Sequence, residues 1–380
     1  MNHLANYDID YIVQLLNLPD LNPHMQEFKT ALLQVNEVLP TPHQGTEPEI
    51  IKGVLNHLQK IKQDQENRKH KHTVQHYITE LLFKSRSVNI YNSLNNTERL
   101  WLNKAKKELC SRIWLDLIPK MPAFTLSNEE FRYALLYKFL IPIRQITLGN
   151  KCNCNRKSSV DVFGHHFVAG CPKDNARGER HNLIANTVKT MCQYCKINTT
   201  REELHCFITA NQPNSKKRPD LSIHEAVTTS AYNKELVDVS VTTAVTGVFE
   251  GPVRPVTDAQ TTNVLQAVEK GANSKNNKYK ATANQNNYEF IPFILDINGC
   301  LNKEGKKLIA KLAERGASIK GIPVKTIRDY FLKLLSAALQ RSNGHMIYKK
   351  LLQSKSKALP HVVTANIGDD DLIRYHQVHR

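Results

Sequence analysis

Apolar side chains follow different spacings in different parts of the chain. Over residues 1–148 they recur at intervals of three and four, and strand-like alternation is scarce, which is typical of helices that bury one face. After residue 218, short apolar runs indicate strands at 219–223, 235–245 and 290–297, and helical spacing returns at 262–283 and 303–315. Strands that alternate with helices predict an α/β domain here.

Local signals mark further helices. Ser127 stands three residues before Glu130, and this capping-box pattern predicts an apolar helix over 131–140 that ends before Pro142. Helical spacing also covers 181–194. A last amphipathic helix is expected from the apolar positions Ile327, Phe331, Leu334, Leu335 and Leu339, with a polar tail after Ser354.

One polar segment, 63–76, cannot form part of a core because it contains Arg68-Lys69-His70-Lys71-His72. It is interpreted either as a solvated helix face or linker, or as a phosphate-contacting patch. Together the patterns predict an α/β protein in four parts: a helical region over 1–148, a small metal-binding element over 149–176, a mixed sheet flanked by helices over 177–325, and a C-terminal helix with a polar tail over 326–380.

Composition is that of a globular protein. The 380 residues are 41% hydrophobic, which is enough to bury at least one sizeable core. The best apolar runs, such as 290–295, are much shorter than the roughly 18–20 residues of a membrane span. Residues 1–10 are polar and lack the apolar stretch of a signal peptide. We therefore expect an intracellular protein without a membrane segment.

Net charge favours a polyanionic partner. Lys and Arg number 52 against 35 Asp and Glu, a formal charge of +17, and such an excess attracts nucleic acid through counterion release. The alternative is that the basic residues only solvate the surface. Nucleic acid is the leading partner on this evidence.

A group of Cys and His residues predicts a zinc site. Cys152, Cys154, His166 and Cys171 lie within twenty residues, in a stretch without periodic apolar positions, and zinc favours this ligand set. His165 competes with His166, which we favour because a spacing of about four residues before the last cysteine is a common short closure.

The other cysteines have simpler explanations. Cys192 and Cys195 form a second candidate pair, but they fall on a helical stretch where packing of small apolar side chains explains them equally well. Cys110, Cys206 and Cys300 are expected to be buried thiols.

Two carboxylates on neighbouring strands form the second candidate site. A hairpin is expected from Arg218-Pro219-Asp220 followed by Val237-Asp238-Val239, which would bring Asp220 and Asp238 together. Alternation puts Val237, Val239 and Val241 on the buried face and Asp238 with Ser240 on the other, so we expect Asp238 to be presented and not buried. Paired carboxylates can hold Mg²⁺ or Mn²⁺ beside a phosphate, whereas a lone strand Asp is usually a surface residue.

A cation that could assist such a site is absent from the second strand. The position two residues beyond Asp238 holds Ser240, so Lys275, Lys278 and Tyr279 on the following helix become candidates. Val268, Ala272, Lys275 and Tyr279 fall on one helical stripe. The alternative is a solvated Lys-Asn-rich turn, because Gly271, Asn273, Asn276 and Asn277 are weak helix formers.

The order of these motifs resembles the C-terminal restriction-like endonuclease region of site-specific non-LTR retrotransposon polyproteins, a branch of the PD-(D/E)xK superfamily. The resemblance covers about residues 101–315, and its motifs are weak singly but specific in this order. They are Trp114-Leu115 with Pro119, the capped helix 127–140, Cys152-x-Cys154 with Gly164-His165-His166 and Cys171, Arg180-His181-Asn182, Arg218-Pro219-Asp220, Val237-Asp238-Val239, and Lys275-x-x-Lys278-Tyr279 before Pro292-Phe293.

The resemblance implies a restriction-endonuclease-like fold behind a Cys-Cys-His-Cys zinc knuckle, and an enzyme that nicks target DNA so that a reverse transcriptase can prime on the cut strand. Asp220 and Asp238 would then bind the divalent metal. Lys275 and Tyr279, with Lys278 beside them, would serve as the displaced lysine, and Arg180 with His181 would lie near the DNA backbone or the active centre. The chain has no Tyr-x-Asp-Asp motif, so we expect it to lack a polymerase.

Three functions are compatible with these features. The first is a metal-dependent, nuclear DNA endonuclease in which Lys216, Lys217 and Arg218 hold phosphates. The second is a catalytically inactive, zinc-containing retroelement remnant that still binds nucleic acid. The third is a structural zinc domain that tethers a partner through its N-terminal helices. DNA is the expected partner, with RNA as a second candidate; no membrane and no small-molecule cofactor are expected.

Overall fold

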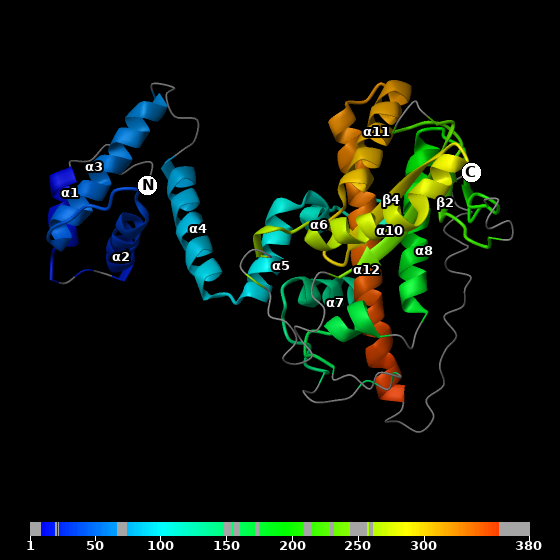
Figure 1. Ribbon diagram of the computed structural model, residues 1–380. Helices are drawn as coiled ribbons and strands as arrows, with labels where there is room; N and C mark the ends of the chain where they lie inside the picture. Colours follow the sequence, from blue (N-terminus) through cyan, green and yellow to red (C-terminus); the bar gives the residue numbers. More distant parts are fainter. Residues whose placement is uncertain are drawn as a thin grey trace. The chain divides into compact units, whose positions relative to one another are not determined.

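The computed structural model in Figure 1 describes residues 9–19, 21, 23–66, 74–146, 152, 154, 160–171, 175–208, 215–228, 232–243, 257 and 261–356. The chain divides into two compact units, residues 1–94 and 95–380.

The first unit consists of helices in its described part. These are α1 (Ile9–Leu16), α2 (Pro23–Val38), α3 (Glu47–Glu66) and α4 (Val74–Ser93). The apolar positions of α1, α2 and α3 meet in one core that includes Leu16, Leu32, Ile51 and Val54. The helical character expected from the three-and-four spacing is confirmed, because each helix turns one apolar stripe inward. Of the polar segment 63–76, residues 67–73 lie outside the described residues.

The second unit begins with short helices. They are α5 (Asn96–Lys107), α6 (Leu109–Arg112), the 3-10 turns η2 (Ile113–Asp116) and η3 (Pro122–Phe124), and α7 (Asn128–Lys138). The predicted capping box of α7 is confirmed: the Ser127 backbone N–H donates to Glu130 Oε2 at 2.9 Å, and the Glu130 N–H donates to Ser127 Oγ at 3.2 Å.

A mixed four-stranded sheet forms the centre of the second unit. Helix α8 (Ala176–Tyr194) precedes β1 (Thr199–Arg201), β2 (Leu221–Ile223) and β3 (Lys234–Thr242), and α10 (Gln266–Gln285) links β3 to β4 (Tyr288–Asp296). The strand order is β1-β2-β3-β4, in which β1 to β3 pair antiparallel and β3 pairs with β4 in parallel. The three predicted strands are confirmed, and the short edge strand β1 adds to them. A mixed α/β fold is therefore established.

Helices cover both faces of this sheet (Figure 1). Helix α8, α11 (Lys303–Lys320) and α12 (Val324–Ser356) pack on the face that carries Val237, Val239 and Phe293. Helix α10 packs on the other face, against Leu236, Phe290 and Ile294. Alternating side chains of β3 and β4 therefore enter two different cores, as the pleat of a strand requires.

The unit boundary lies at 94/95, and the sheet's unit includes the helices at 95–146 and the C-terminal helix. Lys104 on α5 and Asp296 at the end of β4 form an ion pair in which both side chains are fully buried. Helix α12 packs against α7, α8 and α11. The tail after residue 356 lies outside the described residues.

The excess of positive over negative charge lies in the second unit. Residues 95–380 contain 43 Lys and Arg against 25 Asp and Glu, whereas residues 1–94 contain 9 against 10. Electrostatic attraction of a polyanion would therefore act on the unit that carries the sheet. Within the described residues, every helix is too short or too polar to cross a bilayer.

Candidate zinc and carboxylate sites

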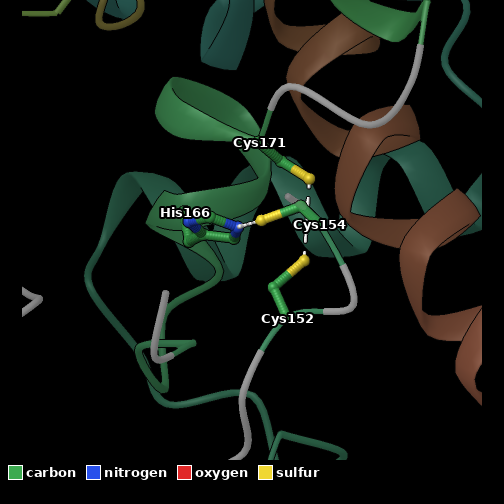
Figure 2. A group of neighbouring side chains, drawn as sticks. All are labelled: Cys152, Cys154, His166 and Cys171. Atoms are coloured by element: carbon green, nitrogen blue, oxygen red, sulfur yellow. Dashed lines mark hydrogen bonds between the residues drawn. The ribbon is translucent and has the colours of Figure 1, made fainter. Parts of the chain in front are cut away.

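Four side chains predicted to bind zinc converge in the structure. Cys152, Cys154, His166 and Cys171 are all buried, and their ligand atoms lie within 4.8 Å of one another (Figure 2). Cys152 Sγ is 3.6 Å from Cys171 Sγ, and Cys154 Sγ is 3.6 Å from His166 Nε2. Tetrahedral zinc with bonds of about 2.0 Å to nitrogen and about 2.3 Å to sulfur places those ligand atoms about 3.5–3.8 Å apart, so this group could hold a metal such as zinc.

A buried carboxylate shapes the turn that supplies two of these ligands. Asp161 accepts backbone N–H groups from Phe163 at 3.0 Å, His165 at 2.9 Å and His166 at 2.8 Å. The next turn, the π-helical η4 (His166–Gly170), ends where Cys171 N–H donates to His166 O at 2.8 Å. These bonds place His166 and Cys171 on one side of the turn, opposite the two loop cysteines (Figure 2).

The choice of His166 over His165 is confirmed. His165 is buried away from the cysteine group, and its Nδ1 lies 2.8 Å from the Tyr137 hydroxyl on α7. His165 thus attaches the turn to the helical part of the unit, whereas His166 faces the cysteines. The contact with Tyr137 therefore gives His165 a structural role.

The remaining cysteines are buried thiols. Cys192 and Cys195 lie in the core at the end of α8, and Cys195 Sγ donates to Leu312 O at 3.0 Å. Burial raises the pKa of Cys110 to about 12. Within the described part of the chain, these cysteines join no group of three or more metal-ligating side chains.

The two candidate carboxylates lie beside the point where β2 pairs with β3. Leu221 of β2 pairs with Val237 of β3, so Asp220, which immediately precedes β2, and Asp238 are each adjacent to this pair. The Asp220 carboxylate contacts Val239 and His181 of α8, whereas the Asp238 carboxylate contacts Lys275 of α10. Burial is the main cause that raises the pKa of Asp238, and the Asp220 charge adds to this rise.

Asp220 is held by the backbone of β3 and by α8. Its Oδ2 accepts the Val239 N–H at 2.6 Å and lies 3.1 Å from His181 Nε2. The same His181 nitrogen is 3.1 Å from Val239 O. Because both neighbours are acceptors, Nε2 carries the hydrogen, and the hydrogen bond to Asp220 raises the pKa of His181.

Asp238 is buried, so the expectation that it would be presented was wrong. The residue is 8% exposed, and burial is the main cause that raises the pKa of its carboxyl group. Alternation assigned Asp238 correctly to the face opposite Val237 and Val239. That face is covered as well, because α10 packs over it, and a periodicity of two cannot show whether the second face of a sheet is solvated.

Helix α10 supplies the cation next to Asp238. Lys275 Nζ lies 2.6 Å from Asp238 Oδ2, and this ion pair opposes the rise in the Asp238 pKa. The predicted stripe is confirmed: Val268 and Ala272 are fully buried, and the Tyr279 ring packs against Phe290 with centroids 5.5 Å apart. The alternative of a solvated turn is wrong, because the segment is helical.

A cluster of lysines surrounds Tyr279. The Nζ atoms of Lys278, Lys275 and Lys217 lie 4.9, 5.7 and 6.0 Å from its ring centre. Lys278 is exposed at the surface. Of Lys275 and Lys278, Lys275 is the one that forms an ion pair with Asp238. The structure thus distinguishes Lys275, at the carboxylate pair, from Lys278, at the rim.

The predicted nucleic-acid contacts differ in accessibility. Lys216, Lys217 and Arg218 are exposed just before β2, and Arg218 pairs with Glu202 at 3.3 Å. Arg180 is only 3% exposed, and its Nη1 donates to Val168 O and to Asn343 Oδ1, each at 3.0 Å. The Arg180 guanidinium therefore joins the zinc turn to α12, and its place near the DNA backbone stays a prediction.

Two groups that shape the candidate sites were not predicted from the sequence. The Val239 backbone holds both Asp220 and His181, and such a role has no signal because it belongs to the main chain. Asp161 had a weak signal, since an Asp shortly before a glycine turn often accepts nearby N–H groups.

No protein-family model matches the chain, and no curated protein matches it either. The function proposed below therefore rests on the residues of the two sites.

Proposed function

We propose that this chain is a metal-dependent DNA endonuclease of the restriction-like PD-(D/E)xK type, derived from a non-LTR retrotransposon, and that it hydrolyses phosphodiester bonds in nuclear DNA. The observation that carries the proposal is the proximity of Asp220, directly before β2, to Asp238 in β3, with Lys275 Nζ 2.6 Å from Asp238. Lys275 on helix α10 would supply the cation that a lysine at position 240 would otherwise provide, because that position holds Ser240.

The donor set suits a hard divalent cation. Carboxylate oxygens are the ligands that Mg²⁺ and Mn²⁺ prefer, and Asp220 and Asp238 would hold the ion. When bound, the ion would supply a polarised water and positive charge for a phosphodiester under attack. The zinc-type ligands lie in a separate group of three cysteines and one histidine, so the two metals would not compete for one site.

The side chains around the carboxylates orient them. The Val239 N–H and His181 Nε2 both contact Asp220 Oδ2, which fixes the direction of that carboxylate. Lys275 is positioned to place its ammonium beside a phosphate that reaches Asp238 and to stabilise developing negative charge there. The exposed residues 216–218 lead directly to Asp220 and would contact the DNA backbone.

Nicking of supercoiled plasmid tests the proposal. The zinc-loaded full chain is incubated with Mg²⁺ or Mn²⁺, and nicked product is quantified for the wild type, Asp220→Asn and Asp238→Asn. Asp116→Asn is the matched control, because Asp116 is exposed and lies on the short turn η2, not on a strand. We expect nicking by the wild type and the control and none by either site variant.

The same experiment distinguishes the inactive alternative. Ser240, which stands where a strand lysine would be expected, is the observation that supports this second candidate. If the wild type binds DNA in a salt-dependent manner but nicks it with neither metal, and both Asp variants bind equally well, the chain is a nucleic-acid-binding remnant and the enzymatic proposal fails.

A further inference from the structure

A pocket of about 420 Å³ opens between the beginning of α8 and the end of β3. Three basic side chains line it: Arg177, Arg180 and His181. The β3 residues 240–241 form the opposite wall, and none of the described residues in the lining is acidic. Since His181 also contacts Asp220, the pocket adjoins the carboxylate pair.

Arg180 places a buried positive charge at the pocket. Within the described chain it pairs with no carboxylate, and its Nε has no hydrogen-bond partner even though the residue is 3% exposed. Burial lowers its pKa to about 10, which reflects the cost of holding a cation out of water. A buried charge without a counterion favours the binding of an anion beside it.

The start of α8 adds backbone N–H donors, which carry partial positive charge. This helix has 19 residues, and the side chain of its N-cap residue, Asn175, makes no capping hydrogen bond. The first backbone N–H groups of a helix lack intrahelical partners, and together with the helix dipole they favour an anion. Gly178, in the first turn, and Asn175, whose side chain lies against Gly178, both line the pocket.

The free edge of β3 completes the pocket. Strand β2 pairs with β3 as far as Val237, and beyond that point the backbone groups of Val239 contact Asp220 and His181. Backbone groups two residues apart on a strand point to the same edge, so those of Val241 face the pocket. The pocket therefore combines side-chain cations with backbone donors on both walls.

We propose that this pocket binds a phosphate of the DNA backbone next to the phosphodiester that is cut, with Arg177 as the accessible cation and Arg180 as the buried charge behind it. This inference rests on the proposed endonuclease function and names a substrate subsite for it. The pocket volume falls within the roughly 300–1,000 Å³ typical of organic ligand sites, so a phosphate can enter together with its sugar.

Arg177→Gln tests the proposal, with Arg328→Gln as the matched control. Both arginines are exposed on helices and both changes remove one charge, but Arg328 lies on α12 and does not line the pocket. Arg180 is unsuitable for the test because it also holds Val168 and Asn343. The zinc-loaded full chain is titrated with a short DNA duplex at several NaCl concentrations, with Ca²⁺ replacing Mg²⁺ to prevent cleavage.

We expect Arg177→Gln to reduce the slope of log affinity against log salt by about 0.9, the value for one phosphate contact. Arg328→Gln should retain the wild-type slope, and Arg177→Lys should retain most of it. In a second measurement, thymidine 5′-monophosphate should raise the thermal unfolding midpoint of the wild type and of Arg328→Gln but not that of Arg177→Gln, with NaCl at equal ionic strength as reference.

Several outcomes would overturn the inference. An unchanged salt slope and unchanged protection in Arg177→Gln would show that the pocket holds no phosphate. Nucleotide protection that depends on Arg177, combined with an unchanged salt slope for DNA, would assign the pocket to a free nucleotide and contradict the DNA subsite. Plasmid nicking separates this result from the proposed function: loss of slope without any nicking would leave the subsite intact and refute the nuclease.

Discussion

The buried ion pair between Lys104 and Asp296 makes the stability of the sheet depend on the helices at 95–146. Both side chains are fully buried, and Asp296 Oδ1 additionally accepts the N–H groups of Asn298 at 2.9 Å and Cys300 at 2.8 Å. Replacing Lys104 with Met leaves Asp296 as a buried carboxylate that has lost its closest cation. Removing one partner of a buried pair costs about 3–5 kcal/mol.

A nearby lysine reduces this cost. Lys138 is buried in the same region, its pKa is lowered to about 8 mainly by burial, and Asp296 partly offsets that shift. Its Nζ donates to Ser111 Oγ at 2.6 Å, so it can compensate the Asp296 charge only in part. We therefore expect Lys104→Met to lower the free energy of unfolding by about 3 kcal/mol, the lower end of that range.

Urea denaturation followed by tryptophan fluorescence measures this change in the second unit alone. The chain has two tryptophans, Trp101 and Trp114, and both are buried in that unit. With a slope of roughly 2–3 kcal/mol per molar urea, the midpoint should fall by about 1–1.5 M. The double variant Lys104→Met, Asp296→Asn removes both charges and should recover a large part of the loss.

Two results would refute this reasoning. The first is a Lys104→Met midpoint within about 0.3 M of the wild type, which would mean that the pair contributes little. The second is a double variant whose loss equals the sum of the two single losses, because charges that compensate each other must show coupling.

Three further predictions concern the two sites. The purified chain should contain one zinc ion, and Cys154→Ser should release it and lower the thermal midpoint of the second unit, whereas the buried Cys206→Ser should keep the metal; equal zinc content in both variants would contradict the site. Asp161→Ala removes the acceptor of three backbone N–H groups and should weaken zinc binding about 10- to 100-fold, measured by competition with a chelating dye; unchanged affinity would show that the turn forms without it. Lys275→Met should lower the plasmid-nicking rate about 10²- to 10⁴-fold, while exposed Lys278→Met has a smaller effect; the reverse order would transfer the role to Lys278.

The amino-acid sequence by itself determined most helices and strands and the members of the zinc group. These features are local: the three-and-four spacing of α10, the alternation of β3 and the Ser127 capping box depend on neighbours a few residues away. The zinc ligands lie within twenty residues of one another, so their type and spacing were sufficient.

Tertiary structure alone decided which groups lose contact with water and which distant residues meet. Burial of Asp238 depends on α10 covering the second face of the sheet, and burial of Arg180 depends on Val168 and Asn343, which approach it from other elements. The three-residue strand β1 is too short to carry a periodic signal and exists because β2 supplies its hydrogen bonds. Such contacts are set by packing between elements far apart along the chain, which no local pattern of residues encodes.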